Sequence, residues 1–286
     1  MSSMRLANIA WATALLTAFT SFAANTAKAQ STETDISARL IDKPLFLMGL
    51  FADDKLKFDA QGHPAGNYHT APFTVCGMHI DKVTVHGSHL KFEGEREGIT
   101  FDKEGTMTRQ TMMVSAGLSP NNLKPEKMSV EIDNGNSHDF GSAIDAVLTE
   151  NPEKLAPMLP DMWQPYFKKH FGARPPLEQS NSTQPASDSG KPARTGGRVR
   201  PPRLIHNVEP EFNEYARRLK FSGNSQIYLR VDENGSPSHV SVYRPAGMGL
   251  DEKAVEAVQQ YRFSPATRDG VPVKTDLYID VNFQIF

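Results

Sequence analysis

The strict alternation of the last strand-like stretch limits most strongly what this chain can fold into. Every second residue from Leu277 to Ile285 is apolar, and the residues between them include Asp280, Asn282 and Gln284. Successive side chains of a β-strand point to opposite faces, so the alternation predicts a strand with one buried and one exposed face. Such a strand needs partner strands and a layer that covers its apolar face.

A hairpin is predicted upstream of this strand. Ile227–Val231 alternates between apolar and polar residues in the same way, and Val240 and Val242 resume the alternation a few residues later. Between them, Asn234–Gly235 supplies residues that tolerate the positive φ angles of a tight turn. The three segments together predict a small antiparallel sheet.

Helices are predicted on either side of the hairpin. From Leu250 to Tyr261 the apolar residues recur at helical spacing, Asp251 stands where a capping residue is expected, and Pro265 ends the pattern. A shorter helix is predicted to start near Pro210. The region is therefore expected to be an α+β domain in which two helices cover a three-stranded antiparallel sheet.

The order of these elements resembles the C-terminal domain of TonB-type energy transducers, over residues 203–286. Phe212–Asn213 stands where that family has Tyr-Pro, and Tyr261 replaces the Trp that opens a Trp-x-Phe-x-Pro-Ala pattern. Arg262, Phe263, Pro265, Ala266 and Gly270 fit the family pattern. The motif residues expected to be structural are Gly235, Tyr261, Arg262, Phe263, Pro265 and Gly270.

The resemblance implies a peptide-binding function. In the TonB family, the edge of the sheet takes up the TonB box of an outer-membrane receptor as an added strand. Here that edge would be Lys274–Ile285, with the segment before the first helix beside the incoming strand. Two alternatives stay open for this strand: pairing in a homodimer, and burial as a terminal core strand. The partner-binding residues implied are Glu209, Pro210, Glu211, Phe212, Asp276, Tyr278, Asp280 and Asn282.

The start of the chain has the features of an export signal. Arg5 is followed by the apolar stretch Leu6–Ala24 and the A-x-A site Ala27–Ala29, so residues 1–29 are predicted to be a signal peptide and the mature chain periplasmic. The alternative is an uncleaved signal anchor in the inner membrane, because Leu6–Ala24 approaches the roughly 20 residues that span a bilayer. The anchoring helix of the TonB family carries a Ser and a His that engage ExbB and ExbD. Leu6–Ala24 contains no His, which leaves these two partners in doubt.

Residues 30–172 are predicted to form a separate β-rich domain, a sandwich or a barrel. Short alternating segments such as Lys82–Val85 and Met128–Ile132 recur there, separated by turn residues. Phe140–Leu148 has helical spacing, and Leu155–Phe171 is predicted to contain short helices. No known family is recognised in this region.

Residues 173–202 are predicted to be a linker. The segment is rich in Pro, Ser, Gly and Arg and has no apolar periodicity. A chain of this composition buries too little apolar surface to offset the entropy of ordering. The sequence therefore predicts a disordered connection between two separate domains.

Nothing in the sequence indicates catalysis, a cofactor or nucleic-acid binding. It has no GxSxG, HExxH or CxxC motif, and its net charge of −2 argues against a nucleic-acid partner. Cys76 is the single cysteine, which excludes an intrachain disulfide, and its apolar surroundings predict a buried thiol. One stretch of the sequence is rich in histidine, and solvated side chains are favoured there over a metal site. These histidines are His63, His69, His79, His86 and His89.

Two functions of different class are compatible with these observations. One is a TonB-like periplasmic protein that binds an extended peptide of an outer-membrane receptor during transport. The other is an exported scaffold or adaptor that keeps the TonB C-terminal fold without coupling to the proton-motive force. In the second case the β-rich domain would supply the main partner.

Overall fold

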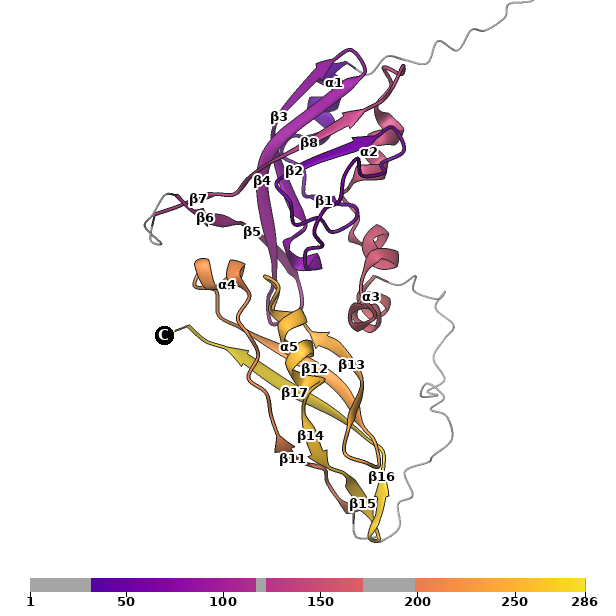
Figure 1. The fold of residues 1–286 in the computed structure, drawn as a ribbon, viewed down its shortest axis with the longest axis vertical. Helices are drawn as coiled ribbons and strands as arrows, with labels where there is room; N and C mark the ends of the chain where they lie inside the picture. Colours follow the sequence, from indigo (N-terminus) through magenta and orange to yellow (C-terminus); the bar gives the residue numbers. More distant parts are fainter. Residues whose placement is uncertain (1–31, 117–121, 172–198, 286) are drawn as a thin grey trace, which may run out of the picture.

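A computed structural model describes residues 32–116, 122–171 and 199–285 of the chain. The described residues form two stacked parts, a β-rich part above and a C-terminal part below (Figure 1). The predicted signal segment 1–29 and most of the predicted linker lie outside the described residues. Among the described residues, no helix combines the length and the apolar composition that crossing a membrane requires.

The β-rich part contains one large sheet. Its strand order is β2-β8-β4-β3-β1-β9, and β5 also pairs with β4, outside this order. All its pairs are antiparallel except β2 with β8. The elements are α1 (Glu33–Leu40), β1 (Leu45–Leu47), β2 (Lys55–Asp59), η1 (Phe73–Val75), β3 (Gly77–His86), β4 (His89–Phe101), β5 (Met107–Thr111), β6 (Met113–Ser115), β7 (Leu123–Pro125), β8 (Lys127–Asp133), α2 (Gly141–Val147), β9 (Leu148–Thr149), η2 (Pro152–Met158), η3 (Asp161–Trp163) and α3 (Gln164–His170).

The prediction of a sandwich or barrel is not confirmed. Instead of a second packed sheet, α1 and α2 share one core with the inner side chains of the large sheet, which include Phe92 and Ile80. Helix α2 corresponds to the helix predicted at Phe140–Leu148. Gly94 lies inside β4, where a Cβ atom would come within 1.9 Å of the backbone oxygen of His79. Glycine is needed at this position because the two strands approach so closely.

The C-terminal part is organised around a three-stranded antiparallel sheet of order β13-β12-β17. Helix α5 packs on β12 and β13. Two small ladders, β11-β14 and β10-β15-β16, extend the part beyond the predicted elements. The elements are β10 (Val199–Arg200), β11 (Arg203–His206), α4 (Glu214–Arg218), β12 (Gly223–Val231), β13 (Pro237–Arg244), α5 (Leu250–Val258), β14 (Arg262–Ser264), β15 (Ala266–Arg268), β16 (Val271–Val273) and β17 (Thr275–Phe283).

The end of the predicted linker is ordered. Val199–Arg200 forms β10, which pairs with Thr267 and Arg268 of β15. The residue composition alone did not indicate this, because the partner strand lies far along the chain. The prediction of a disordered segment is therefore wrong for these two residues.

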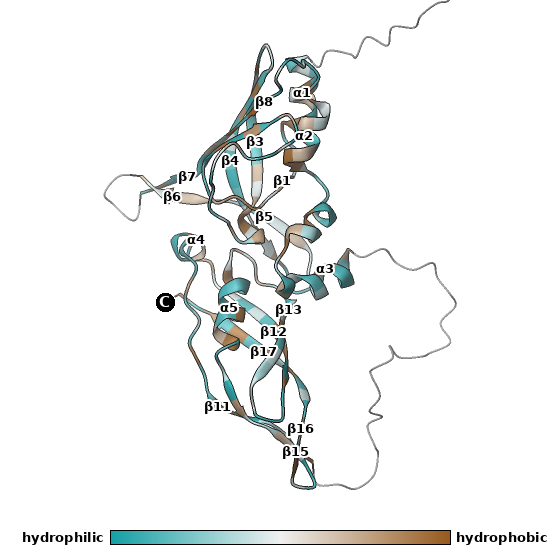
Figure 2. Cartoon of the chain, turned by 45° about the vertical axis from the view of Figure 1, so that its right-hand side comes forward, coloured by the Kyte–Doolittle hydropathy of each residue, from teal (hydrophilic) through white to brown (hydrophobic). Residues whose placement is uncertain are grey.

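The two parts share a continuous core, against the expectation of separate domains. Phe73 and Trp163 of the β-rich part are buried in one cluster with Met248 and Leu250 of the C-terminal part. Helix α3 lies beside β13 in both views of the chain (Figures 1 and 2). The contact between the two parts is called the seam below.

Hydrogen bonds also join the two parts at the seam. The amide of Met248 donates to the carbonyl oxygen of Ile99 over 2.9 Å, and the amide of Gly249 donates to Thr74 Oγ1 over 2.7 Å. Thr100 and Gly247 form an isolated β-bridge. The backbone of the C-terminal part therefore continues the hydrogen bonding of the β-rich part.

Candidate functional site: a sheet edge and the groove beside it

The final strand, β17, lies at the edge of the C-terminal sheet. It pairs with β12 in unbroken register from Thr275 opposite Val231 to Phe283 opposite Gly223. No strand of the described residues pairs with its other side. Backbone N–H and C=O groups on an unpaired side of a strand can accept an additional strand.

Alternation along β17 separates a core face from an outer face. Val281 and Phe283 are buried, and Leu277 and Ile279 are partly buried against the same core. The four residues that the sequence placed outward, Asp276, Tyr278, Asp280 and Asn282, are all exposed. The amphipathic pattern thus orients the strand as predicted.

Side chains of β12 hold the outward residues of β17 in place. Arg230 donates to Asp276 through Nε over 2.7 Å and through Nη2 over 3.3 Å. This hydrogen bonding lowers the pKa of Asp276. Asp280 Oδ1 accepts from Asn224 Nδ2 over 3.2 Å and from Gln226 Nε2 over 3.0 Å. The polar rim along this edge is therefore arranged before any partner arrives.

Comparison with known proteins identifies the domain that carries this edge. The profile of the Gram-negative bacterial TonB protein C-terminal family matches residues 208–285. Residues 208–285 form a TonB C-terminal domain.

Two curated relatives agree with this assignment. Protein TonB of Vibrio cholerae is 29% identical over 87 residues, which are 30% of this chain and 36% of that protein. Protein tonB2 of Pseudomonas aeruginosa is 30% identical over 82 residues, which are 28% of this chain and 30% of that protein. The chain thus spans about a third of the length of each relative.

The segment before α4, at the start of the TonB C-terminal domain, packs near the end of β17. The ring of Phe212 meets the ring of Phe283 edge to face, with 5.4 Å between the centroids. Glu211 lies 3.5 Å from the Nζ atom of Lys253. Glu209 is exposed and Pro210 is half-buried. Phe212 is therefore a core contact, whereas Glu209 and Glu211 are the exposed residues of this segment.

The predicted motif residues of the TonB C-terminal domain lie in turns and in the core. Tyr261 and Phe263 are buried, and Arg262 donates to the carbonyl oxygen of Tyr261 over 2.7 Å. Gly235 has a φ of 84°, and a Cβ atom there would lie 1.8 Å from the backbone oxygen of Phe263. Gly270 has a φ of 87° in the turn between β15 and β16, and Pro265 separates β14 from β15. These positions thus serve the fold.

Asp251 does not cap α5 as the sequence predicted. The N-cap is Gly249, and the carboxylate of Asp251 reaches back to the preceding loop. It accepts from the amides of Ala246 and Gly247, each over 2.8 Å, and from Ser225 Oγ over 2.6 Å. Burial nevertheless raises the pKa of Asp251 to about 6. The carboxylate fixes the loop that carries the seam contacts.

The histidines of the β-rich part lie beside carboxylates rather than in a cluster. His63 and His69 lie 3.0 and 3.1 Å from Asp59 and Asp53. His86 and His89 face each other across the β3–β4 turn. In the ranges that the structure describes, no group of three His, Cys, Asp or Glu residues is arranged to hold a metal ion.

The thiol of Cys76 is buried as the sequence predicted. Burial raises its pKa to about 12. A thiol with so high a pKa is protonated at neutral pH and is a poor nucleophile.

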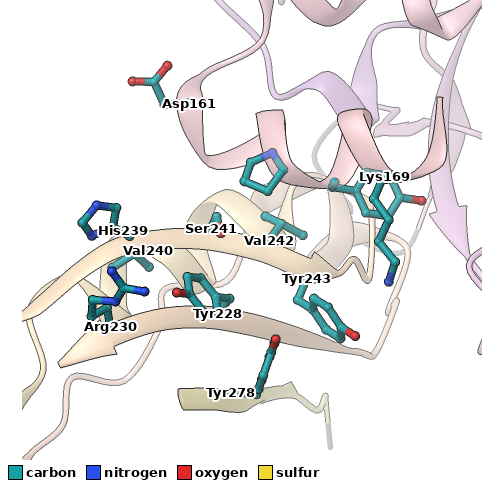
Figure 3. Close-up of a pocket in the computed structure, with 12 residues that line it drawn as sticks. Asp161, Lys169, Tyr228, Arg230, His239, Val240, Ser241, Val242, Tyr243 and Tyr278 are labelled. Atoms are coloured by element: carbon teal, nitrogen blue, oxygen red, sulfur yellow. The ribbon is translucent and has the colours of Figure 1, made fainter. Parts of the chain in front are cut away.

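A groove that the sequence did not predict runs along the outer face of the sheet. One hollow of about 620 Å³ lies between η3, α3 and the outward side chains of β12, β13 and β17 (Figure 3). A second hollow of about 740 Å³ continues toward the β4–β5 turn. Tyr166, Lys169 and Tyr243 line both hollows. Because α3 lies far from the strands in the sequence, no local motif marks this groove.

Proposed function

We propose that this protein is a TonB-like component of the cell envelope that binds an extended peptide of an outer-membrane transport receptor. The peptide adds as a strand to the free side of β17. The observation that carries the proposal is the nine-residue β17, which is paired through its full length on one side and with no described strand on the other. The assignment of residues 208–285 to the TonB C-terminal family supports the choice of partner.

In this function the backbone supplies affinity and the outer face supplies selectivity. An added strand exchanges N–H···O=C bonds with β17, and its alternate side chains lie beside Asp276, Tyr278 and Asp280. Two of these three residues are carboxylates, so a peptide with basic or hydroxyl side chains at alternate positions fits best. Asn282 extends the same row.

A TonB-box peptide that is N-methylated at alternate residues tests strand addition directly. In an added strand, alternate amides donate to β17 and the remaining amides point away. Methylation of the first set should weaken binding at least tenfold by isothermal titration, and methylation of the second set should change it less than twofold. Equal effects of the two sets would mean that the peptide does not bind as a strand.

An exported scaffold or adaptor is the second candidate, and the seam favours it. A TonB C-terminal domain that shares its core with another part of the chain is held in one orientation. Capture of envelope proteins by the full chain with Asp280→Lys in β17 distinguishes the two functions. Loss of receptor capture with other partners retained favours the scaffold, and loss of all partners favours the strand-addition function.

The N-terminus decides whether either function operates at the membrane. The predicted cleavage site is followed by Gln30. We expect mass spectrometry of the native protein to give a chain that begins at Gln30. Such a chain would be periplasmic. A chain that keeps residues 1–29 and fractionates with the inner membrane would instead be anchored, and coupling to ExbB and ExbD would then be favoured.

A further inference from the structure

The groove between α3 and the outer face of the sheet has the form of a second binding site, distinct from the free side of β17. We propose that it binds an extended, proline-containing peptide segment that carries an acidic side chain at its centre. Only Tyr278 and Asp280 of β17 border the groove. A strand added to β17 would lie beyond this strand, so the two sites are neighbours without being the same.

The shape of the groove suits an extended chain. The two hollows meet at Tyr166, Lys169 and Tyr243, and together they run from His239 on β13 to the β4–β5 turn. Each hollow has the volume of an ordinary ligand pocket. A compact ligand would fill only one of them, whereas an extended peptide occupies both.

Three tyrosine rings form the floor of the first hollow. The centroids of Tyr243 and Tyr278 are 4.6 Å apart, and those of Tyr228 and Tyr278 are 5.6 Å apart. Figure 3 shows the three rings side by side on adjoining strands. Grooves lined by aromatic rings bind proline-rich segments, because a polyproline II chain is already extended and loses little entropy on binding.

The charges along the groove place an acidic group at its centre. Lys169 Nζ lies 4.5 Å from the centre of the Tyr243 ring, and the guanidinium carbon of Arg244 lies 6.0 Å from it. Within the described residues, neither cation forms an ion pair with a carboxylate, whereas Arg230 is bound to Asp276. A carboxylate between Lys169 and Arg244 would therefore gain two favourable charge interactions.

Carboxylates at both ends of the groove sharpen this pattern. Asp161 borders the first hollow on the side away from Lys169 (Figure 3). Asp102 and Glu104 border the second hollow at the β4–β5 turn. Arg230 at the first end is already paired with Asp276, and Lys103 at the second end stands between Asp102 and Glu104 in the sequence. An acidic residue therefore gains most in the middle of a bound segment.

Both parts of the chain are needed to build this groove. Lys169 and the buried Tyr166 come from α3, and Tyr166 is held by a stacking contact with His170 at 4.3 Å between centroids. The floor comes from the TonB C-terminal domain. Docking at the seam therefore creates a site that neither part has alone, and this gives the β-rich part a role in recognition.

Fluorescence polarisation with the full chain and a labelled peptide of sequence Ala-Pro-Pro-Glu-Pro-Pro-Ala tests the proposal. We expect saturable binding of this probe, at least tenfold weaker binding when its Glu is replaced by Lys, and a similar loss when its prolines are replaced by Ser. The absence of saturable binding up to millimolar peptide, or equal binding of the serine peptide, would overturn the proposal.

Matched variants locate the site. Lys169→Glu should weaken the probe about tenfold, whereas Lys168→Glu, on the next exposed residue of α3, should change its affinity less than twofold. Tyr243→Ser should weaken binding and Tyr243→Phe should retain it, since the ring and not the hydroxyl forms the floor. Equal effects of the two lysine variants, with circular dichroism unchanged, would remove the groove from consideration. So would displacement of the probe by a TonB-box peptide in equimolar competition.

Discussion

The two hydrophobic cores of this chain are built differently. The upper core lies wholly within the β-rich part, where α1 and α2 cover apolar side chains such as Phe92. The core at the seam draws residues from both parts and has the buried carboxyls of Asp251 and Glu252 beside it. When either part unfolds, the other part loses the core contacts that the two share. We therefore expect the TonB C-terminal domain and the β-rich part to unfold as one cooperative unit.

Trp163→Ala should have the largest effect on the seam. The ring is fully buried, packs edge to face on Phe73 at 5.2 Å, and donates from Nε1 to Glu252 Oε1 over 2.9 Å. Removal of a buried Trp side chain costs about 3–5 kcal/mol through lost burial and the cavity that remains. We expect that loss in the free energy of unfolding, measured by urea denaturation and circular dichroism, in a single shifted transition.

Phe92→Ala is the matched control in the upper core. If the parts unfold as one unit, it also shifts a single transition by a similar amount. Two separate transitions, with only one of them shifted by each variant, would contradict the comparison and make the parts independent domains.

The sequence predicted the strands of the C-terminal sheet better than the seam. Alternation from Leu277 onward and the Asn234–Gly235 turn are local signals, and β17 and the β12–β13 hairpin follow from them. Gly247 and Gly249 lie in the loop between β13 and α5, where both have positive φ angles. Their function depends on Ile99 and Thr74, which lie far away in the sequence.

The candidate site also has one part that the sequence predicts and one part that it does not. The outward residues of β17 follow from the period of a strand, because burial of one face fixes the direction of the other. The groove does not follow from any such period. Lys169 lies on a short helix and Tyr243 on a strand, and only the docking of the two parts brings them within 4.5 Å. Docking of this kind leaves no mark in the spacing of residues.

Glu252 is the residue through which pH should act on the seam. Burial raises the pKa of its carboxyl to about 7, and the nearby Asp251 adds to the effect. Its Oε2 atom is buried without a hydrogen-bond partner in the part of the chain that the structure describes. An unfolded Glu has a pKa of about 4.3, so the folded chain binds more protons between about pH 4.3 and 7. The free energy of unfolding must therefore fall as pH rises through this interval, by on the order of 3–4 kcal/mol.

Substitution of Glu252 isolates this contribution. The pKa of Asp251 is about 6, so its own contribution is lost mainly as pH rises from about 4 to 6. The interval from pH 6 to 7 therefore reports mainly on Glu252. Glu252→Gln should flatten the dependence of urea midpoints on pH in this interval. Glu256→Gln, at an exposed position on the same helix, should reduce it only slightly, because the charge of Glu256 is a minor cause of the raised pKa of Glu252. A slope that persists in Glu252→Gln would assign the pH dependence to another group.

Arg230→Gln should have the smallest effect on the free energy of unfolding. It tests whether the outer face of the sheet, unlike the seam, can change without loss of the fold. The side chains of Arg230 and Asp276 are 41% and 48% exposed, so their ion pair is screened by solvent and contributes only about 0–1 kcal/mol. We expect the unfolding free energy to fall by less than about 1 kcal/mol.

The same variant has a second readout at the sheet edge. Hydrogen bonding from Arg230 is the main reason that the pKa of Asp276 is lowered, so Arg230→Gln should bring that pKa back toward its ordinary value in a carboxyl NMR titration. The small stability contribution of this pair is lost as pH falls through the lowered pKa of Asp276. A loss of stability as large as that of Trp163→Ala would make the outer face part of the structural core. A small loss with a clear pKa change leaves the seam as the structural contact and the outer face free for partners.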